Sequence, residues 1–151
     1  MVTRSEEETV RLGRLIASHL PPGSFLLLSG ELGCGKTVLV RGVAEALGIP
    51  PDEISSPSFN IVHEYDNLVH VDLYRLEALE QLEDLGFEDF LTDERIKVVE
   101  WGKPLKEIVE NFVEVECRDR GGEREFTICD PKGKICRLLK TEFGGTDVEN
   151  S

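Results

Sequence analysis

Residues 24–37, SFLLLSGELGCGKT, carry the strongest structural signal in this 151-residue chain. The first part, residues 24–29, is a short and nearly continuous apolar run, which is typical of a strand covered on both faces in a parallel α/β sheet. The second part matches the pattern G-x-x-x-x-G-K-[ST] from Gly30 to Thr37. An amphipathic segment follows at 36–47, as expected of a helix. The stretch therefore predicts a strand, a phosphate-binding loop and a helix in succession.

Each residue type in this loop has a chemical role in holding phosphate. Glycines let the backbone wrap closely round an anion and point N–H groups inward. The helix that begins near Lys36 directs the positive end of its dipole to the same place. Lys36 would reach the β- and γ-phosphates of a nucleotide, and the Thr37 hydroxyl would bind Mg²⁺. A glycine-rich turn without function is the alternative, but the flanking strand and helix favour nucleotide binding.

A nucleotide hydrolase of this class also needs an acid at the end of an apolar strand, to hold the metal ion or polarise water. Glu100 ends the run Ile96-Lys97-Val98-Val99, and Asp72 follows Val69-His70-Val71. A solvated carboxylate at a strand end is the alternative for either residue. The phosphate-binding loop makes that alternative less favoured, because without an acid the metal ion and its water would be poorly positioned.

The overall charge limits the partners that this chain can bind by itself. It has 17 Lys and Arg against 30 Asp and Glu, which gives a net charge of −13. Such a surface repels phosphate backbones, so unaided binding to nucleic acid or to an anionic membrane is disfavoured. Any bound phosphate needs a local site that works against the global field, and dependence on a divalent cation would follow.

Composition and length predict one cytoplasmic domain. There is no apolar run long enough to span a membrane and no apolar segment of a secretory signal near the start. We expect a single domain over residues 1–143 and a disordered tail over 144–151. The four cysteines, Cys34, Cys117, Cys129 and Cys136, lack C-x-x-C spacing and are expected to be reduced thiols.

Hydrophobic periodicity predicts the remaining elements. The expected fold is a small P-loop NTPase domain of the α/β class, with a mixed and mainly parallel sheet flanked by helices and a C-terminal β-hairpin. The predicted elements are a helix at 5–20 capped by Ser5, a helix stop at Gly48, a hairpin or two adjacent strands at 58–73, a helix at 76–85, a strand at 96–101, a short helix opened by Pro104, a hairpin at 113–128 and a further strand at 135–139.

Several short motifs occur together in the order and spacing of one known family. They are Glu8-Thr9-x-x-Leu12-Gly13, the P-loop from Gly30 to Thr37, Ser56-Pro57-Ser58-Phe59, His70-Val71-Asp72-Leu73-Tyr74-Arg75, Leu85-Gly86-Phe87-Glu88 and Glu100-Trp101. The set resembles the TsaE (YjeE) family, the ATPase component of the bacterial machinery that makes threonylcarbamoyladenosine in tRNA. The resemblance covers about Glu7 to Trp101 and is loose beyond it.

The resemblance implies a role for each matching residue. The P-loop residues Glu31, Leu32, Gly33, Cys34, Gly35, Lys36 and Thr37 would hold the phosphates of ATP. Thr37 and Glu100 would bind Mg²⁺, and Asp72 would stand by the metal ion and the attacking water, so Lys36, Asp72 and Glu100 form the expected catalytic set. Thr9 would lie near the nucleotide base, Ser56 to Phe59 would form a switch over the γ-phosphate, and Trp101 would pack beside the site.

The resemblance also implies partners. The family works in a complex with the proteins TsaD and TsaB, so contact with tRNA would be indirect, and no membrane is involved. Tyr74, Arg75 and the acidic segment 77–93 are candidates for the partner surface, with a solvated helix face as the alternative. The chain departs from the family pattern at Glu31, Val38, Cys34 and Ser58, but none of these changes removes a residue that the chemistry needs.

Two other functions are compatible with the same loop. A small P-loop kinase would transfer the γ-phosphate to a metabolite and would use an arginine-bearing lid; Arg118, Arg120 and Arg124 cluster at the predicted hairpin turn. A non-catalytic adaptor would only sense nucleotide. A GTPase is less favoured, because no Asn-Lys-x-Asp motif is present. Arg41 and Arg75 are candidates for a catalytic arginine, and a partner could also supply one.

Overall fold

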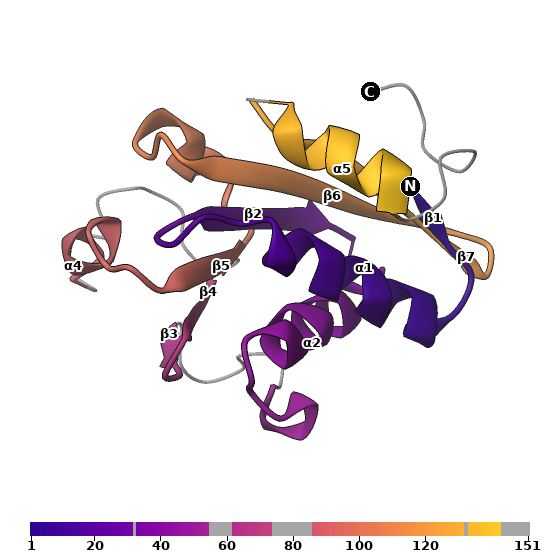
Figure 1. Cartoon of the computed structure of the whole chain (residues 1–151), viewed down its shortest axis with the longest axis horizontal. Helices are drawn as coiled ribbons and strands as arrows, with labels where there is room; N and C mark the ends of the chain where they lie inside the picture. Colours follow the sequence, from indigo (N-terminus) through magenta and orange to yellow (C-terminus); the bar gives the residue numbers. More distant parts are fainter. Residues whose placement is uncertain (32, 55–61, 74–85, 132, 143–151) are drawn as a thin grey trace.

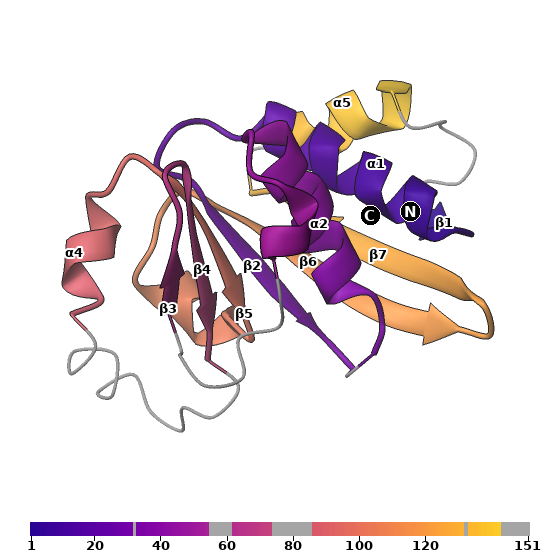
Figure 2. The same ribbon diagram turned by 90° about the horizontal axis from the view of Figure 1, so that it is seen from below.

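The computed structural model describes residues 1–31, 33–54, 62–73, 86–131 and 133–142. These residues form a seven-stranded sheet in the order β1-β7-β6-β2-β5-β4-β3, with helices packed against it (Figures 1 and 2). The strands are β1 (Val2–Thr3), β2 (Phe25–Gly30), β3 (Val62–Glu64), β4 (Leu68–Asp72), β5 (Ile96–Glu100), β6 (Phe112–Arg120) and β7 (Glu123–Cys129). The helices are α1 (Glu6–Ser18), α2 (Lys36–Ala46), α4 (Glu88–Leu91) and α5 (Lys134–Glu142), with 3₁₀ turns η1 (Pro51–Glu53) and η2 (Lys103–Glu107).

The middle of the sheet is parallel and its two margins are antiparallel. Strands β6, β2, β5 and β4 run in the same direction, whereas β3, β7 and β1 are added antiparallel at the edges. This is the mixed, mainly parallel sheet that the sequence predicts. The predicted C-terminal hairpin is β6 with β7, and β6 lies directly beside β2. The hairpin is therefore part of the main sheet, next to the strand that leads into the P-loop.

Two apolar layers cover the two faces of β2, because successive side chains of a strand point to opposite faces. Leu26 and Leu28 pack under α1, α2 and α5, whereas Phe25 and Leu27 pack against η2 and the region of α4. All four side chains are buried. Full burial of each such side chain contributes about 1.5–3 kcal/mol, so β2 is firmly anchored at the centre.

The ends of α1 and α2 match their sequence signals. The Ser5 side chain caps α1 by accepting a hydrogen bond from the Glu8 backbone N–H at 3.1 Å, while Glu8 Oε1 accepts from the backbone N–H of Arg4 at 2.8 Å. Gly48 follows α2 with a φ of +80°, a left-handed conformation that favours glycine. The start of α1 and the end of α2 thus lie where the sequence predicts them, whereas α1 ends at Ser18, two residues before the predicted end.

The expected strand at 135–139 is wrong, because this segment lies within α5. Ile135 and Leu139 are four residues apart and both are buried, which places them on one face of a helix. The Asp130 carboxylate accepts a hydrogen bond from the Ile135 N–H at 2.7 Å at the start of the helix. The outer edge of β7 is already paired with β1. This strand has only two residues, which is too short for a periodic pattern to reveal it.

Other predicted elements are confirmed or lie outside the described residues. Strands β3 and β4 form the antiparallel pair expected within 58–73, and the segment after Pro104 is a 3₁₀ turn rather than an α-helix. The predicted helix at 76–85 and the predicted tail at 144–151 lie outside the described residues. Among the helices that the structure describes, none has the length and apolar character needed to cross a membrane.

Helices α1 and α2 lie side by side on one face of the sheet and touch through their backbones (Figure 2). A Cβ on Gly13 would lie 2.3 Å from the Leu39 carbonyl oxygen, and a Cβ on Gly42 would lie 2.2 Å from the Val10 carbonyl oxygen. Real Cβ atoms do not approach backbone so closely, so these glycines set the distance between the helices. Because α2 starts at the P-loop, this contact also positions the loop.

We predict that Gly42→Ala lowers the free energy of unfolding by about 1–3 kcal/mol, the usual range for overpacking a core contact. The added methyl group must push α1 and α2 apart, because backbone atoms cannot move aside locally. Urea unfolding followed by circular dichroism measures the change. Ala46→Gly, at the exposed end of α2, is the control and should lower stability by about 1 kcal/mol at most through helix propensity alone. An unchanged unfolding midpoint for Gly42→Ala would contradict the close packing.

Candidate functional site

The P-loop leaves β2 through backbone conformations that glycine adopts easily. Gly30, Gly33 and Gly35 have φ values of +139°, +79° and +113°. A Cβ on Gly30 would lie 2.2 Å from the carbonyl oxygen of Cys117 on the neighbouring strand β6. Side chains at these positions would therefore be strained or would clash, and the loop can curl back tightly only with glycine. The first turn of α2 begins directly after Gly35, so its unpaired N–H groups face the loop.

Lys36 is buried at the centre of this loop, with 6% of its surface exposed. Its Nζ donates hydrogen bonds to the carbonyl oxygens of Gly30 at 2.6 Å and Glu31 at 3.1 Å. The same ammonium group lies 4.7 Å from the centre of the Trp101 ring. Trp101 itself has a φ of +61°, an uncommon conformation for a bulky side chain. The loop and Trp101 thus hold a positive charge in a fixed place.

Glu100 lies at the end of β5, and its side chain is paired with a buried histidine. Glu100 is 5% exposed, and its Oε2 lies 2.6 Å from Nε2 of His70 on β4. With Glu100 ionised, Nε2 must carry the proton, because a carboxylate only accepts hydrogen bonds. Among the described residues, His70 Nδ1 has no hydrogen-bond partner. Asp72 is the register partner of Glu100 across the two strands and is half-buried.

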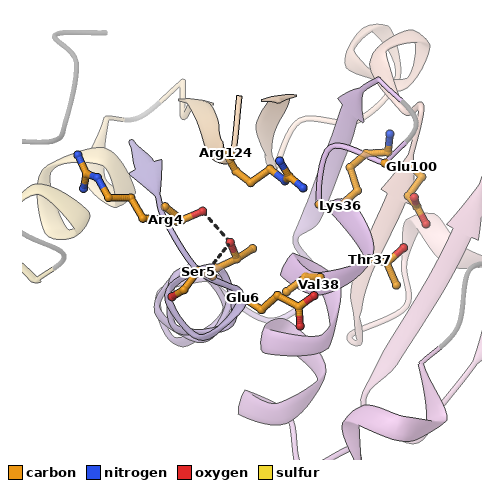
Figure 3. Close-up of a pocket in the computed structure, with 13 residues that line it drawn as sticks. Arg4, Ser5, Glu6, Lys36, Thr37, Val38, Glu100 and Arg124 are labelled. Atoms are coloured by element: carbon orange, nitrogen blue, oxygen red, sulfur yellow. Dashed lines mark hydrogen bonds between the residues drawn. The ribbon is translucent and has the colours of Figure 1, made fainter. Parts of the chain in front are cut away.

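Lys36 and Glu100 both line one cavity of about 490 Å³. Figure 3 shows Lys36, Thr37 and Glu100 together on one side, Arg4 and Ser5 on the other, and Arg124 between them. The lining contains three basic side chains and two acidic ones, so the site is locally more positive than the molecule. The lining residues are Thr3, Arg4, Ser5, Glu6, Thr9, Gly33, Gly35, Lys36, Thr37, Val38, Glu100, Gly122 and Arg124.

Comparison with known proteins identifies the family. The family described as "Threonylcarbamoyl adenosine biosynthesis protein TsaE" matches residues 3–126. The chain belongs to the TsaE family. It is 37% identical to the tRNA threonylcarbamoyladenosine biosynthesis protein TsaE of Treponema pallidum, over 84% of this chain and 97% of the relative. It is 44% identical to the protein of the same name from Streptomyces coelicolor, over 66% of this chain and 72% of the relative.

A solved structure supports the fold of this TsaE family member independently. The crystal structure of Bacillus subtilis YdiB superposes with a TM-score of 0.72 at 29% sequence identity. The similarity covers 98% of this chain and 95% of YdiB. The P-loop NTPase fold predicted from residues 24–37 is therefore confirmed, and so is the family.

The donor set of this TsaE site suits a magnesium–nucleotide complex. The cavity is large enough for a nucleotide-sized ligand. Loop amides, the α2 N-terminus and the Lys36 ammonium are donors for phosphate oxygens. Mg²⁺ prefers oxygen ligands and binds to one or two protein groups together with substrate phosphates. The Thr37 hydroxyl and the Glu100 carboxylate supply such oxygens on the same side of the cavity.

The other predicted site residues are placed as follows. Thr9 lines the cavity, but its hydroxyl bonds to the Thr3 hydroxyl at 2.6 Å and to the Ser5 carbonyl at 3.2 Å. It therefore holds β1 to α1 and shapes the cavity wall. Glu31 is exposed, Cys34 is buried, and neither residue lines the cavity, nor does Asp72. The predictions for Leu32, for Ser56 to Phe59, and for Tyr74 and Arg75 lie outside the described residues.

Two residues, His70 and Arg124, have places at the site that the sequence does not predict. His70 is two positions before Asp72, so strand periodicity places both side chains on one face of β4. That signal was available, but the pairing of His70 with Glu100 depends on the order of β4 and β5. Arg124 lies far along the chain from the P-loop, and it reaches Gly35 because the hairpin pairs beside β2. No spacing pattern in the sequence indicates that contact.

Cys34, inside the P-loop, has an unusual thiol environment. The pKa of Cys34 is lowered to about 7. A hydrogen bond with the Cys117 thiol and the positive charge of Lys36 lower this pKa, and together they outweigh burial, which raises it. Lys36 Nζ lies 4.0 Å from Cys34 Sγ. The hydrogen bond with Cys34 and burial raise the pKa of Cys117. Cys117 Sγ also lies 2.8 Å from the carbonyl oxygen of Cys34. A pKa of about 7 makes Cys34 partly a thiolate at neutral pH, close to the Lys36 ammonium.

We predict that the rate of Cys34 alkylation by iodoacetamide rises with pH with a midpoint near 7, because only the thiolate reacts. Cys117→Ala removes the hydrogen bond that stabilises the thiolate, so the midpoint should move up towards the ordinary thiol value. Cys117→Ser keeps a donor and should retain most of the lowered pKa. Mass spectrometry of the Cys34 peptide measures the rates. The same midpoint in wild type and Cys117→Ala would contradict this cause.

Proposed function

We propose that this chain is a Mg²⁺-dependent ATPase that acts in the synthesis of threonylcarbamoyladenosine on tRNA. The proposal rests mainly on the observation that Lys36, Thr37 and Glu100 line one side of a single cavity. These are the three kinds of group that a P-loop ATPase uses to bind phosphate and a metal ion. Relatives at 37% and 44% identity bear names from threonylcarbamoyladenosine biosynthesis, which supports the biological setting.

The residues of the loop would bind the triphosphate. Lys36 Nζ donates hydrogen bonds to the Gly30 and Glu31 carbonyls in this structure. With a nucleotide bound, it would donate one or more of these hydrogen bonds to the β- and γ-phosphates instead. Loop amides and the start of α2 would add further donors, and Thr37 with Glu100 would hold Mg²⁺. When bound, the metal ion would neutralise charge that develops on the phosphates. The roles assigned to Lys36, Thr37 and Glu100 thus require no rearrangement of the sheet.

The carboxylates would orient the water that attacks the γ-phosphate. His70 holds the Glu100 side chain through a buried hydrogen bond of 2.6 Å, which limits its rotation towards the metal site. Asp72 ends the neighbouring strand in register with Glu100 and would face the metal ion and its water. A small shift in either carboxylate would misplace the water, so positioning supplies much of the rate.

Protein partners would connect this ATPase to tRNA. A net charge of −13 disfavours direct contact with the tRNA backbone. Binding to protein subunits of the modifying machinery, here TsaD and TsaB, avoids that repulsion. We infer that ATP hydrolysis drives this complex, and that the isolated chain hydrolyses ATP slowly.

The arrangement of the hairpin arginines favours hydrolysis over a kinase lid. Arg118 pairs with Glu116, Arg120 with Glu125 and Arg124 with Asp119, all within the β6–β7 hairpin. These residues belong to the central sheet rather than to a separate flap that could close on a second substrate. A non-catalytic adaptor would use the same binding residues without the carboxylates, so variants of the carboxylates separate the two functions.

We predict that Lys36→Ala impairs ATP binding, whereas Glu100→Gln impairs ATP hydrolysis. Lys36→Ala removes a charge-assisted phosphate contact and should weaken ATP binding by about tenfold to hundredfold. Glu100→Gln keeps the shape of the side chain but loses the charge, so hydrolysis should fall by about 10²-fold or more while ATP still binds. Isothermal titration calorimetry and phosphate release measure the two effects.

Lys106→Ala, an exposed lysine paired with Glu114 outside the cavity, is the matched control and should behave as wild type. Thermal unfolding of each variant checks that the fold is retained. Normal hydrolysis by Lys36→Ala would overturn the assignment of this loop. A Glu100→Gln variant with full biological function but no hydrolysis would favour the adaptor.

Addition of TsaD and TsaB should raise the ATP hydrolysis rate of this chain, because partner contact would complete the site. The measurement is steady-state phosphate release with each partner alone and with both together, with Glu100→Gln as the control for contaminating ATPase. Failure of both partners to bind the chain in pull-down, with and without ATP, would contradict this part of the proposal.

A further inference from the structure

A second cysteine lies against the cysteine of the P-loop. Gly30 and Cys117 are register partners on β2 and β6. A Cβ on Gly30 would lie 2.2 Å from the Cys117 carbonyl oxygen and 3.0 Å from Cys34 Sγ. The Cys117 thiol donates a hydrogen bond to the Cys34 carbonyl oxygen at 2.8 Å, and the two thiols also interact directly. Two cysteines that are 83 positions apart in the chain thus meet at one point of the fold.

The surroundings of these two thiols give them different chemical roles. Both cysteines are free thiols in this structure. Lys36 Nζ lies 4.0 Å from Cys34 Sγ, and a cation at this distance favours the thiolate, which is the nucleophilic form of cysteine. Cys117 keeps its proton, because burial and the neighbouring thiol raise its pKa. A reactive thiolate beside a second thiol that can resolve it is the arrangement typical of redox-sensing cysteines.

The route to the buried Cys34 thiol leads through the P-loop. Cys34 and Cys117 are both buried, so neither thiol meets bulk solvent directly. Gly33 and Gly35, on either side of Cys34, line the large cavity. No atom lies within 4 Å of the position that a Cβ on Gly33 would take, so the loop borders open space there. A small oxidant in the cavity is therefore separated from Cys34 only by residues without side chains.

We propose that hydrogen peroxide converts Cys34 and Cys117 into a reversible disulfide, and that this bond lowers the affinity of the P-loop for nucleotide. In the first step the Cys34 thiolate attacks one peroxide oxygen and the O–O bond breaks. The products are Cys34 sulfenic acid and hydroxide, which takes a solvent proton to become water. In the second step Cys117 Sγ attacks Cys34 Sγ, and its proton leaves with the hydroxyl group as water. The two thiols lose two electrons, and the peroxide gains them.

The disulfide changes the P-loop because it holds Cys34 against β6. An S–S bond is about 2.05 Å long, which is shorter than any non-bonded contact between two sulfur atoms. The loop must therefore move towards Cys117 when the bond forms. Lys36 is two residues from Cys34, so the ammonium group and the loop amides shift with it. Donors displaced in this way no longer align with phosphate oxygens. This consequence rests on the proposed nucleotide-binding function.

Peptide mapping tests the bond itself. The reduced chain is treated with hydrogen peroxide, free thiols are blocked with N-ethylmaleimide, and peptides are analysed by mass spectrometry with and without dithiothreitol. We expect a cross-linked peptide that joins Cys34 to Cys117 and disappears on reduction. Cys117→Ser cannot form the bond, so its oxidation should stop at Cys34 sulfenic acid, which dimedone labels. Absence of the cross-link in folded wild type, under conditions that oxidise the exposed Cys129, would overturn the inference.

Nucleotide affinity tests the effect of the bond. Calorimetry should show that peroxide weakens MgADP binding by about tenfold or more, the loss of at least one phosphate hydrogen bond, and that dithiothreitol restores it. Cys129→Ser, which alters an exposed thiol outside the pair, is the matched control and should respond as wild type. The affinity of Cys34→Ala should be the same before and after peroxide, because this variant cannot form the bond.

Two results would contradict the effect on affinity. One is a fully cross-linked chain whose MgADP affinity stays within twofold of the reduced chain. The other is an equal loss in peroxide-treated Cys34→Ala, which would assign the effect to oxidation elsewhere. Failure of the reduced wild type to bind MgATP or MgADP would instead overturn the proposed function itself, and the peptide map distinguishes that result from failure of the disulfide to form.

Discussion

A buried ammonium group organises the site of this acidic protein. Lys36 is 6% exposed and donates to carbonyl oxygens of its own loop, in a molecule with a net charge of −13. The loop carbonyls and the Trp101 ring compensate for the water that the ammonium has lost. The surrounding amides and the helix start add positive potential at the same point. A phosphate-binding centre can therefore exist where the molecule as a whole repels anions.

The rest of the fold keeps that centre in position. Strand β2 is buried between two apolar layers, and α2 is set by glycine contacts with α1. The loop joins these two rigid elements, so its two ends cannot drift apart. Parallel pairing then brings the carboxyl ends of β2, β4 and β5 to one edge of the sheet. Glu100 lines the cavity from that edge, and a buried hydrogen bond joins it to His70.

The C-terminal hairpin, which follows the last short motif at Glu100-Trp101, also contributes residues to the site. Pairing of β6 with β2 places Cys117 under the P-loop and Arg124 across Gly35. The hairpin therefore contributes to the electrostatics of the site as well as to the sheet. Its outer margin is covered by β1, which also joins the sheet to the start of α1 through Thr3 and Thr9. One continuous sheet thus holds both sides of the cavity.

Local chemistry made much of this protein predictable. Residues 24–37 were sufficient for the strand, the loop and the helix start, because glycine geometry and apolar burial act over short distances in the chain. Glu100 and Asp72 were also recognisable as strand-end acids. The prediction of a strand at 135–139 was wrong. The edge of β7 is paired with β1, which is too short to show a periodic pattern, and residues 135–139 form part of α5. The His70–Glu100 bond and the reach of Arg124 to Gly35 arise from strand order and register. Those contacts join residues far apart in sequence, so no local pattern encodes them and packing of the whole chain sets them.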